Sequence, residues 1–284
     1  MTRTVYLNGE YLAENEAKIS IFDRSVLFGD AIYEVAGVSE GKLINFDSHI
    51  ERYLTSLEKL QIPAPLTRDE VLDSFRELIK LNNLVEGLVY MHVSRGVADR
   101  DFIWQKDLTP TVFMFTQTTP SALLEMPEKG IKLKSHPDIR WARRDIKSAN
   151  LLAQVLAKKA AKDADANEAL LVDDKGYVTE CASSSFFIVK GNKIITRPLN
   201  QDILAGRTRQ AIIELCNDND IELIEKQFTL QDALNADEAM SSAALVHMLP
   251  VVEIDGQAIG KGKPGPIYRE LRRIYLAIIQ DSKI

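Results

Sequence analysis

Hydrophobic and polar residues alternate along the first part of the chain in the manner of β-strands. The segment V-Y-L-N-G-E-Y-L alternates around Asn8 and Gly9, a pair that favours the positive φ angles of a tight turn, so it predicts a hairpin. Further strands are expected in A-I-Y-E-V-A-G-V, which is followed by a turn at Gly41, and in G-L-V-Y-M-H-V-S-R-G and T-V-F-M-F-T-Q. The chain should therefore begin with an antiparallel sheet.

Between these strands the apolar spacing changes to that of helices. Apolar residues recur at helical intervals over 50–60, where Asp47 or Ser48 can provide the N-cap and Arg52 lies off the apolar face. The spacing T-x-x-E of a capping box predicts a second helix over 67–81. Strands and helices together predict a compact α+β unit.

The segment 119–130 is rich in turn-forming residues and has no clear periodicity, so we expect an interdomain linker there. It would separate a small N-terminal α+β domain, 1–118, from a larger C-terminal domain, 131–284. Successive hairpin patterns dominate the second half, with a helix over about 148–164 and others after L-A-G-R-T-R, T-L-Q and K-P-G. The predicted fold class is α+β in two domains.

Composition narrows the class of protein. The chain has 284 residues, 45% of them hydrophobic, and a formal net charge of −6, which argues against a nucleic-acid or membrane surface as partner. Cys181 and Cys216 form no disulfide framework, and the first residues lack the apolar core of a signal peptide, so we expect a cytoplasmic protein. No spacing of histidine and cysteine suits a structural metal. A small-molecule ligand is the expected partner.

The tract R-W-A-R-R-D-I-K-S-A-N-L-L places Lys147 among arginines and before an apolar helix. Desolvation by Ile146, Leu151 and Leu152, together with repulsion from the arginines, would favour the free amine of this lysine. A free amine forms a Schiff base with an aldehyde. Taken alone, the tract is also typical of a basic surface turn before a helix.

Three further positions complete a set that pyridoxal 5'-phosphate would explain. Arg52 and the backbone N–H groups at Arg207 and Thr208, where a helix should begin, could bind a phosphate. Glu180 closes the strand Y-V-T-E, and a carboxylate beside a pyridine nitrogen keeps that nitrogen protonated, as an electron sink requires. Taken alone, Glu180 could be an ordinary surface carboxylate.

Seven motifs in order give the chain a resemblance to the class IV, branched-chain-type aminotransferases, which are pyridoxal phosphate enzymes of fold type IV. They are D-R-S-V-L-F-G-D-A-I-Y-E-V, H-I-E-R, S-R-G-V-A-D-R-D-F, the lysine tract, V-T-E followed by serines, I-L-A-G-R-T-R, and M-L-P-V-V-E-I-D-G. They cover nearly the whole chain, and the likeness is greatest to the D-amino acid aminotransferases. The resemblance therefore implies a two-domain fold-type IV architecture and a homodimer.

The resemblance also implies roles for individual residues. Lys147 would form the Schiff base with the cofactor and move the proton during catalysis, and Glu180 would pair with the pyridine nitrogen. Arg52 and the backbone of Arg207 and Thr208 would bind the phosphate, and Arg140 would lie near the phenolic oxygen. Ser242 and Ala243 occupy a hydroxyl-rich run that contacts the phosphate in the family, so at least one such contact is lost at Ala243.

Substrate selection is expected from the first domain. In the D-amino acid enzymes a tyrosine at the place of Tyr33, within Y-E-V ending at Val35, and an arginine at the place of Arg100 bind the α-carboxylate, the arginine from the partner subunit. This chain departs from the pattern at Phe102, where those enzymes carry a histidine, and at Ala182, where they carry a serine. The change at Phe102 implies that part of the carboxylate site is missing or rebuilt, and the change at Ala182 implies different hydrogen bonds near the cofactor ring.

The expected reaction moves the amino group of a D-amino acid, such as D-alanine, to pyruvate or 2-oxoglutarate by a ping-pong mechanism. The alternatives within the fold are an (R)-amine or branched-chain transaminase and a lyase resembling aminodeoxychorismate lyase. A protein that carries the cofactor without catalysis is a further alternative, although Lys147 and Glu180 are both present.

Overall fold

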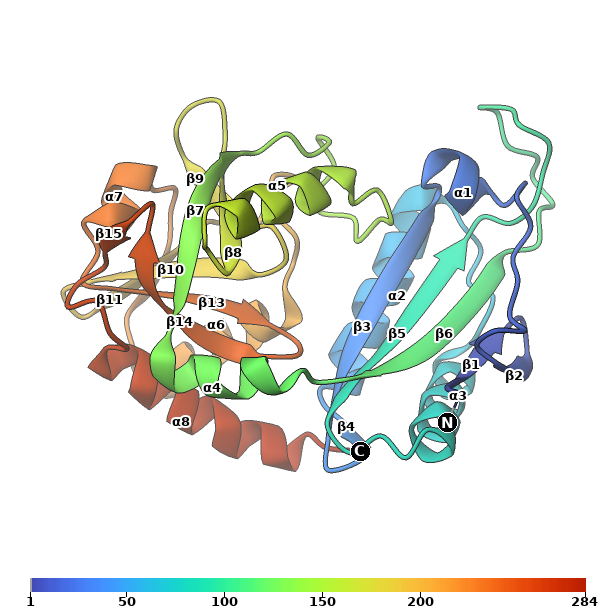
Figure 1. The fold of residues 1–284 in the computed structure, drawn as a ribbon, viewed down its shortest axis with the longest axis horizontal. Helices are drawn as coiled ribbons and strands as arrows, with labels where there is room; N and C mark the ends of the chain where they lie inside the picture. The colour runs from blue at the N-terminus through green and yellow to red at the C-terminus, as the bar shows by residue number, and fades with distance from the viewer. Residues whose placement is uncertain (1) are drawn as a thin grey trace. The chain divides into compact units, whose positions relative to one another are not determined.

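The computed structural model describes residues 2–284, with the side chain of Asp281 left aside. The chain forms two compact units, coloured from blue through green to red along the sequence in Figure 1. The first unit contains residues up to Thr119 together with Ile146–Asn150 and Ser282–Ile284, and the second contains Pro120–Asp145 and Leu151–Asp281. Each unit is built around its own sheet, which makes the protein a two-sheet α+β fold.

The first unit carries a six-stranded antiparallel sheet in the order β2-β1-β6-β5-β3-β4 (Figure 1). Its elements are β1 (Thr4–Leu7), β2 (Glu10–Ala13), α1 (Arg24–Phe28), β3 (Ala31–Ser39), β4 (Lys42–Leu43), α2 (Phe46–Leu60), α3 (Arg68–Leu81), β5 (Gly87–Ser94) and β6 (Thr111–Thr118). The predicted hairpin, strands and capping box are all confirmed: Asn8 and Gly9 have positive φ, and Thr67 and Glu70 cap each other's backbone.

Helices α2 and α3 cover one face of this sheet and form its hydrophobic core (Figure 1). The core includes Phe46, Tyr53 and Phe75. The expected cap at Asp47 or Ser48 is wrong, because α2 already begins at Phe46 after Asn45, which makes no side-chain capping bond. The buried Phe46 ring stabilises this earlier start by packing edge-on against Phe75.

The segment 146–150 differs most from the sequence prediction. A helix was expected from about 148, but α5 begins only at Leu152. Residues 146–150 instead run along the open edge of β3: Tyr33 donates its N–H to the Lys147 carbonyl at 2.9 Å, and Ala149 donates to the Ala31 carbonyl at 2.8 Å. An unpaired strand edge offers these hydrogen bonds, and they outweigh the local preference for helix.

The second unit carries a nine-stranded mixed sheet, in the order β12-β11-β10-β13-β14-β7-β8-β9, with β15 paired to β14. Its elements are α4 (Ser121–Lys129), β7 (Ile131–Pro137), α5 (Leu152–Asp163), β8 (Glu168–Val172), β9 (Val178–Cys181), β10 (Ser185–Lys190), β11 (Lys193–Thr196), α6 (Arg207–Asp218), β12 (Leu223–Glu225), α7 (Leu230–Leu234), β13 (Glu238–Ala243), β14 (His247–Ile254), β15 (Gln257–Ala258) and α8 (Pro266–Asp281).

The segment expected to be a linker, 119–130, is mostly helical. Helix α4 occupies Ser121–Lys129 with Pro127 in its last turn, and Met126 packs against the core of the second unit. Pro127 has no N–H to donate to the carbonyl four residues earlier, so the helix continues with one backbone hydrogen bond fewer. The domain boundaries themselves stay a prediction. No helix among residues 2–284 has the length and apolar character needed to cross a membrane.

Candidate active site

Lys147 lies on the edge segment beside β3. Its neighbour Ser148 forms a β-bridge with Ile32, and the backbone N–H of Lys147 itself points to the Ser56 hydroxyl of α2 at 3.4 Å. The half-buried Lys147 side chain places its Nζ 4.1 Å from the centre of the Tyr33 ring. The backbone is thus held from the strand and from the helix, and the amine is directed over a ring that attracts cations.

The residues of the lysine tract differ in burial and in charge pairing. Ile146 is buried, but Leu152 is 67% exposed on the first turn of α5. The arginines of the tract have their own carboxylates: the Arg143 Nε lies 2.9 Å from Asp145, and Arg140 and Arg144 are also paired. Each of these arginines is therefore balanced by a carboxylate, and its effect on Lys147 stays a prediction.

Arg52 is held by a buried carboxylate that sequence reasoning missed. Its Nε donates to Glu34 Oε2 at 2.9 Å and its Nη2 donates to Glu34 Oε1 at 2.6 Å, while His49 Nδ1 lies 3.0 Å from the same Oε1. Burial by itself would raise the pKa of Glu34, but the Arg52 charge and these hydrogen bonds outweigh it and keep the pKa well below 4.5. Burial lowers the pKa of His49, with Arg52 and Lys147 contributing, so His49 is neutral near pH 7. The result is a rigid, positively charged guanidinium.

In the second unit Glu180 is buried and lies at the end of a short chain of charges. Arg140 Nη1 donates to Glu180 Oε1 at 2.5 Å, and Arg140 is in turn held by Asp138, through Nε at 2.9 Å and Nη2 at 2.7 Å. The Thr179 hydroxyl also donates to Asp138, at 2.7 Å. Burial raises the pKa of Glu180, and the Arg140 charge opposes this. A second cation in front of Glu180, such as a protonated pyridine nitrogen, would favour the carboxylate further.

The start of α6 lies next to the paired strands β10 and β13. Helix α6 begins at Arg207 without a side-chain cap, and Thr208 in its first turn is buried. A Cβ added at Gly206 would come within 2.6 Å of the Ser185 hydroxyl, so a larger residue there would displace that side chain. Ser185 is directly paired with Ser242 of β13. The helix start and two serines therefore line one small region.

That region fits a phosphate. The Ser242 hydroxyl is buried and has no hydrogen-bond partner among residues 2–284, and a buried hydroxyl without a partner is costly unless a ligand supplies one. The first N–H groups of a twelve-residue helix favour an anion. Ala243, the last residue of β13, adds no hydroxyl but keeps its backbone groups. The residues present are consistent with the predicted phosphate-binding role of Ser242, Arg207 and Thr208.

Tyr33 and Val35 lie on the half-exposed face of the first sheet, because side chains alternate along β3 and Glu34 between them points to the helix side. The Tyr33 ring stacks on Tyr90 of β5, with 5.6 Å between ring centres. Tyr90 stacks in turn on Phe115 of β6 at 4.7 Å. These rings give the face a flat, apolar surface next to Lys147.

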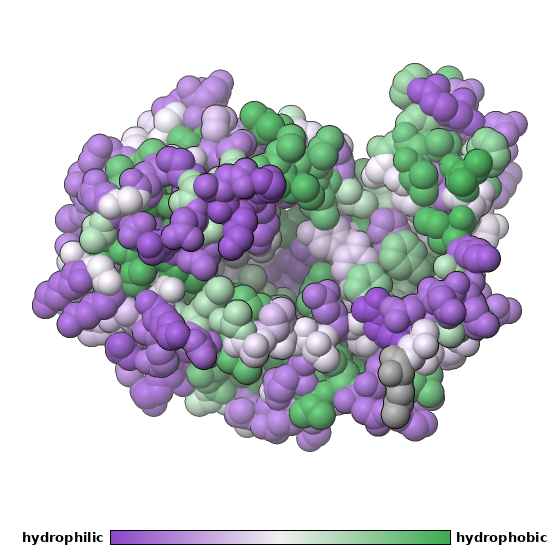
Figure 2. Space-filling view, in the orientation of Figure 1, coloured by the Kyte–Doolittle hydropathy of each residue, from purple (hydrophilic) through white to green (hydrophobic). Residues whose placement is uncertain are grey.

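Arg100 belongs to the loop between β5 and β6. Its guanidinium lies 5.7 Å from the Phe28 ring and 5.4 Å from the Phe102 ring, and it has no ion pair among residues 2–284. Phe102, where the D-amino acid enzymes carry histidine, is 74% exposed, and Ile103 is 80% exposed. Figure 2 shows apolar side chains gathered at the surface of this part of the first unit. Arg100 is therefore an exposed cation between two rings.

The structure thus groups the predicted residues into two sets. The first unit contains Lys147, Arg52, Tyr33, Val35 and Arg100, and the second contains Glu180, Arg140, Arg207, Thr208, Ser242 and Ala243. Glu34 and Asp138 were missed, although a carboxylate between two apolar strand residues, as in I-Y-E-V, is a recognisable sign of a buried ion pair.

Comparison with known proteins agrees with these features. The family model described as Amino-transferase class IV matches residues 31–254. The chain is 40% identical over 279 residues to a D-alanine aminotransferase of Staphylococcus haemolyticus, covering 98% of each chain, and 37% identical over 272 residues to one of Bacillus licheniformis, covering 94% of each.

Two solved structures share the fold. The branched-chain amino acid aminotransferase of Escherichia coli has a TM-score of 0.91 at 22% identity, with 98% of this chain and 95% of that chain covered. The branched-chain amino acid aminotransferase of T.th., solved with pyridoxamine 5'-phosphate, has a TM-score of 0.90 at 24% identity, with 99% and 95% covered.

Proposed function

Because the chain belongs to the class IV aminotransferases, we propose that it transfers the amino group of a D-amino acid, such as D-alanine, to a 2-oxo acid such as pyruvate or 2-oxoglutarate. The observation that carries this proposal is the identity of 36–40% to D-alanine aminotransferases over nearly their whole length. The likeness to branched-chain enzymes, at 22–24% identity, is one of fold.

Pyridoxal 5'-phosphate is the cofactor, and when bound it withdraws the electrons of the broken Cα–H bond. Several residues of this chain would bind it. Arg52, the helix start at Arg207 and Thr208, and the Ser242 hydroxyl suit the phosphate, and the backbone at Ala243 lies beside that hydroxyl. Glu180, oriented by Arg140, suits the pyridine nitrogen. We retain the prediction that Arg140 also lies near the phenolic oxygen.

Lys147 is the catalytic residue of this proposal. Its amine would hold the aldehyde of the bound cofactor, and as a free amine it would move the substrate's Cα proton as a general base and acid. The backbone hydrogen bond from Tyr33 and the ring of the same tyrosine restrict where Nζ can go. A short, fixed path suits a proton transfer between two nearby atoms.

The substrate carboxylate would be bound by Tyr33 and Arg100, with Val35 lining the same sheet face. An exposed guanidinium that has no ion pair within the described part of the chain is suited to bind an anionic substrate group. This separates the proposal from an (R)-amine transaminase, whose substrate has no carboxylate for Arg100 to bind. A lyase resembling aminodeoxychorismate lyase would need no acceptor and would release its product in a single turnover.

We propose that the enzyme is a homodimer and that Arg100 acts in the site of the partner subunit. The loop that carries Arg100 exposes Val97, Phe102 and Ile103, and Phe22, whose carbonyl binds Ala98 of the same loop, is also exposed. In the second unit α5 exposes Leu152, Val155 and Leu156. Apolar groups in such number at a surface favour association with another chain. A second copy is the simplest occupant, since most oligomers are symmetric.

We also place the enzyme in the cytoplasm, because both cysteines are free and buried.

A half-reaction tests the proposed function. The purified protein, loaded with pyridoxal 5'-phosphate, is mixed with D-alanine, L-leucine, (R)-1-phenylethylamine or aminodeoxychorismate without an acceptor, and the cofactor's absorption band is followed. The band should be lost with D-alanine and restored by pyruvate. If the band is lost with L-leucine or with (R)-1-phenylethylamine but not with D-alanine, a branched-chain or an (R)-amine transaminase is favoured. Pyruvate released from aminodeoxychorismate would favour the lyase.

Two lysine variants control this experiment. Lys147→Ala should abolish the response, whereas Lys159→Ala should leave it unchanged, because Lys159 is an exposed residue of α5 that pairs with Asp163 one turn further on. Equal behaviour of the two variants would exclude Lys147 as the catalytic lysine.

A further inference from the structure

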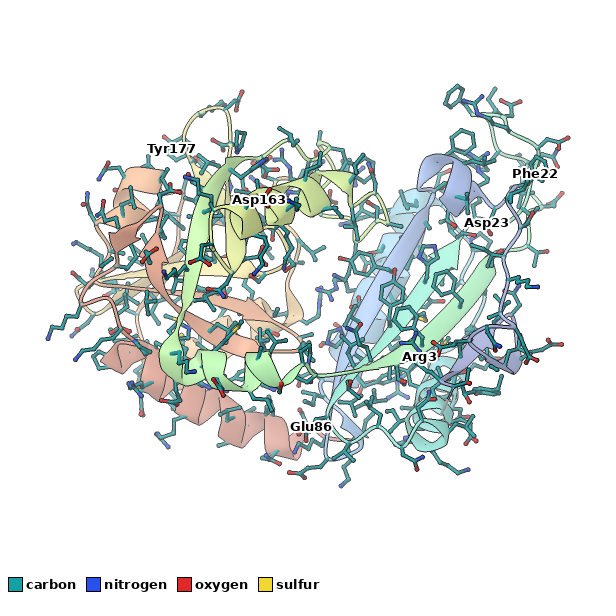
Figure 3. The ribbon with its side chains drawn as sticks, viewed as in Figure 1. Arg3, Phe22, Asp23, Glu86, Asp163 and Tyr177 are labelled. Atoms are coloured by element: carbon teal, nitrogen blue, oxygen red, sulfur yellow. The ribbon has the colours of Figure 1, made fainter. Side chains whose placement is uncertain are left out.

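The motif D-R-S-V-L-F-G-D forms a small structural unit that the proposed function has not used. Asp23 is buried, caps α1 through Ser25 and accepts a hydrogen bond from the Ser94 hydroxyl at 2.9 Å. Figure 3 labels Phe22 and Asp23 on the segment that leads into α1, and Ala98 of the β5–β6 loop donates its N–H to the Phe22 carbonyl at 3.3 Å. This segment and the loop are therefore joined through the backbone.

Arg24 makes the second connection to the same loop. Its side chain is buried, and its Nη1 donates to the Asp101 carbonyl at 2.7 Å while its Nη2 donates to the Phe102 carbonyl at 3.4 Å. Its Nε donates to Asp30 at 2.8 Å. One guanidinium thus binds two successive carbonyls of the loop, immediately after Arg100.

Asp30 also binds a second arginine that touches the loop further on. Arg95 donates to Asp30 through Nε at 2.8 Å and Nη2 at 3.0 Å, and its guanidinium lies 4.1 Å from the Trp104 ring. Arg95 also donates to the Leu60 and Gln61 carbonyls at the end of α2. The loop is therefore tied, through one carboxylate, to the helix that carries Arg52.

Arg24 and Arg100 share an aromatic neighbour. The Arg24 guanidinium lies 4.7 Å from the Phe28 ring, and Arg100 lies 5.7 Å from the same ring. Phe28 packs against Phe102 with 5.5 Å between ring centres. Displacing Arg24 would release both the loop backbone and the ring on which Arg100 rests.

We propose that Arg24, oriented by Asp30, is the positioning residue for the loop 97–104 and thereby sets the affinity for the substrate carboxylate without touching the substrate. This inference rests on the proposed role of Arg100 as carboxylate anchor. Phe102 contributes by its ring and its carbonyl, which gives a physical use to the residue that replaces the family's histidine. Lysine cannot take the place of Arg24, because binding Asp30 and two carbonyls at once requires the planar fork of a guanidinium.

Steady-state kinetics with D-alanine tests the proposal. Arg24→Met and Arg24→Lys should each raise KM for D-alanine about tenfold while kcat changes less than about twofold, since only an interaction with the bound carboxylate is weakened. Arg68→Met is the matched control. Arg68 also pairs with a carboxylate, Asp47, and lies 5.4 Å from the Phe46 ring, but on the exposed side of α2 and α3. The KM of Arg68→Met for D-alanine should equal that of the unmodified enzyme.

A double-variant cycle shows whether Arg24 acts through Arg100. If it does, Arg24→Met adds nothing to the KM of Arg100→Ala, whereas two independent effects would multiply. The proposal would be overturned if the KM effects of the two substitutions multiply, or if kcat of Arg24→Lys falls by as large a factor as its KM rises.

Hydrogen exchange distinguishes failure of this inference from failure of the proposed function. In Arg24→Lys, the amides of residues 97–104 should exchange at least about tenfold faster while those of β3 and β5 keep their protection. This measurement needs no reaction with D-alanine. If the enzyme does not react with D-alanine, the proposed function is refuted, but hydrogen exchange still tests whether Arg24 holds the loop. Unchanged exchange in the loop would overturn the positioning role whatever the substrate is.

Discussion

Replacing Glu34 by glutamine is the sharpest test of how the first unit is built, because it keeps the side chain's size and removes its charge. Glu34 is 1% exposed and binds Arg52 by two charge-assisted hydrogen bonds, of 2.9 and 2.6 Å. Removing one partner of a buried ion pair costs about 3–5 kcal/mol. Glutamine can still accept one of the hydrogen bonds, so we expect a loss of about 3 kcal/mol in the free energy of unfolding at pH 7.

The pH dependence of this loss identifies its cause. The pKa of Glu34 is lower in the folded protein than its ordinary value of 4.5, so its stabilisation is fully present above pH 4.5 and is lost as the pH falls below that value. The difference between the unmodified protein and Glu34→Gln should therefore be constant from pH 7 to about 5 and shrink at lower pH.

Urea unfolding of the cofactor-free protein, at one fixed protein concentration, provides the assay. The control is Glu86→Gln, at the exposed Glu86 labelled in Figure 3, which accepts hydrogen bonds from Ser39 and the Glu40 backbone but pairs with no buried arginine. A loss below about 1 kcal/mol in Glu34→Gln, or a loss that does not depend on pH between 5 and 3, would refute the assignment of Glu34 and Arg52 as a stabilising buried pair.

Three further predictions concern other positions. Lys147→Ala should slow the half-reaction with D-alanine by at least about a thousandfold, measured by single-turnover absorption, while excess cofactor still binds; a smaller loss would assign the proton transfer elsewhere. Ser242→Ala should weaken cofactor affinity about tenfold in a fluorescence titration without lowering the stability of the cofactor-free protein, because the hydroxyl has no protein partner to lose; a drop in stability instead would mean a structural role. Burial lowers the pKa of His92 from 6.5 to about 4, so the protein should lose up to about 3 kcal/mol as the pH falls from 6.5 to 4, and His92→Phe, which preserves the stacking on Phe113, should remove that part of the loss. The His92 prediction would be contradicted if the free energy of unfolding, measured with urea, falls equally in both proteins as the pH falls from 6.5 to 4.

Local features of the sequence were sufficient to predict most elements. The hairpin at Asn8 and Gly9 and the capping box at Thr67 and Glu70 depend on residues only a few positions apart, so neighbouring side chains determine them. The same holds for the start of α6, where Gly206 precedes the helix and polar residues form its first turn. Lys147 and Glu180 could be singled out as candidates because their motifs have a characteristic order along the chain.

The tertiary structure decided which of these groups are paired. Glu34 and Arg52 are eighteen residues apart and Arg140 and Glu180 forty, and no local pattern indicates which distant charge each of these carboxylates pairs with. Segment 146–150 is the clearest case, because its residues suit a helix but the open edge of β3 provides hydrogen bonds that only the assembled sheet can offer. Local preference amounts to a fraction of a kcal/mol per residue, whereas leaving buried backbone groups unpaired costs several times more. The sequence by itself therefore determined most of the elements and the candidate residues. The packed structure determined the backbone that carries Lys147 and the carboxylates that bind Arg52 and Arg140.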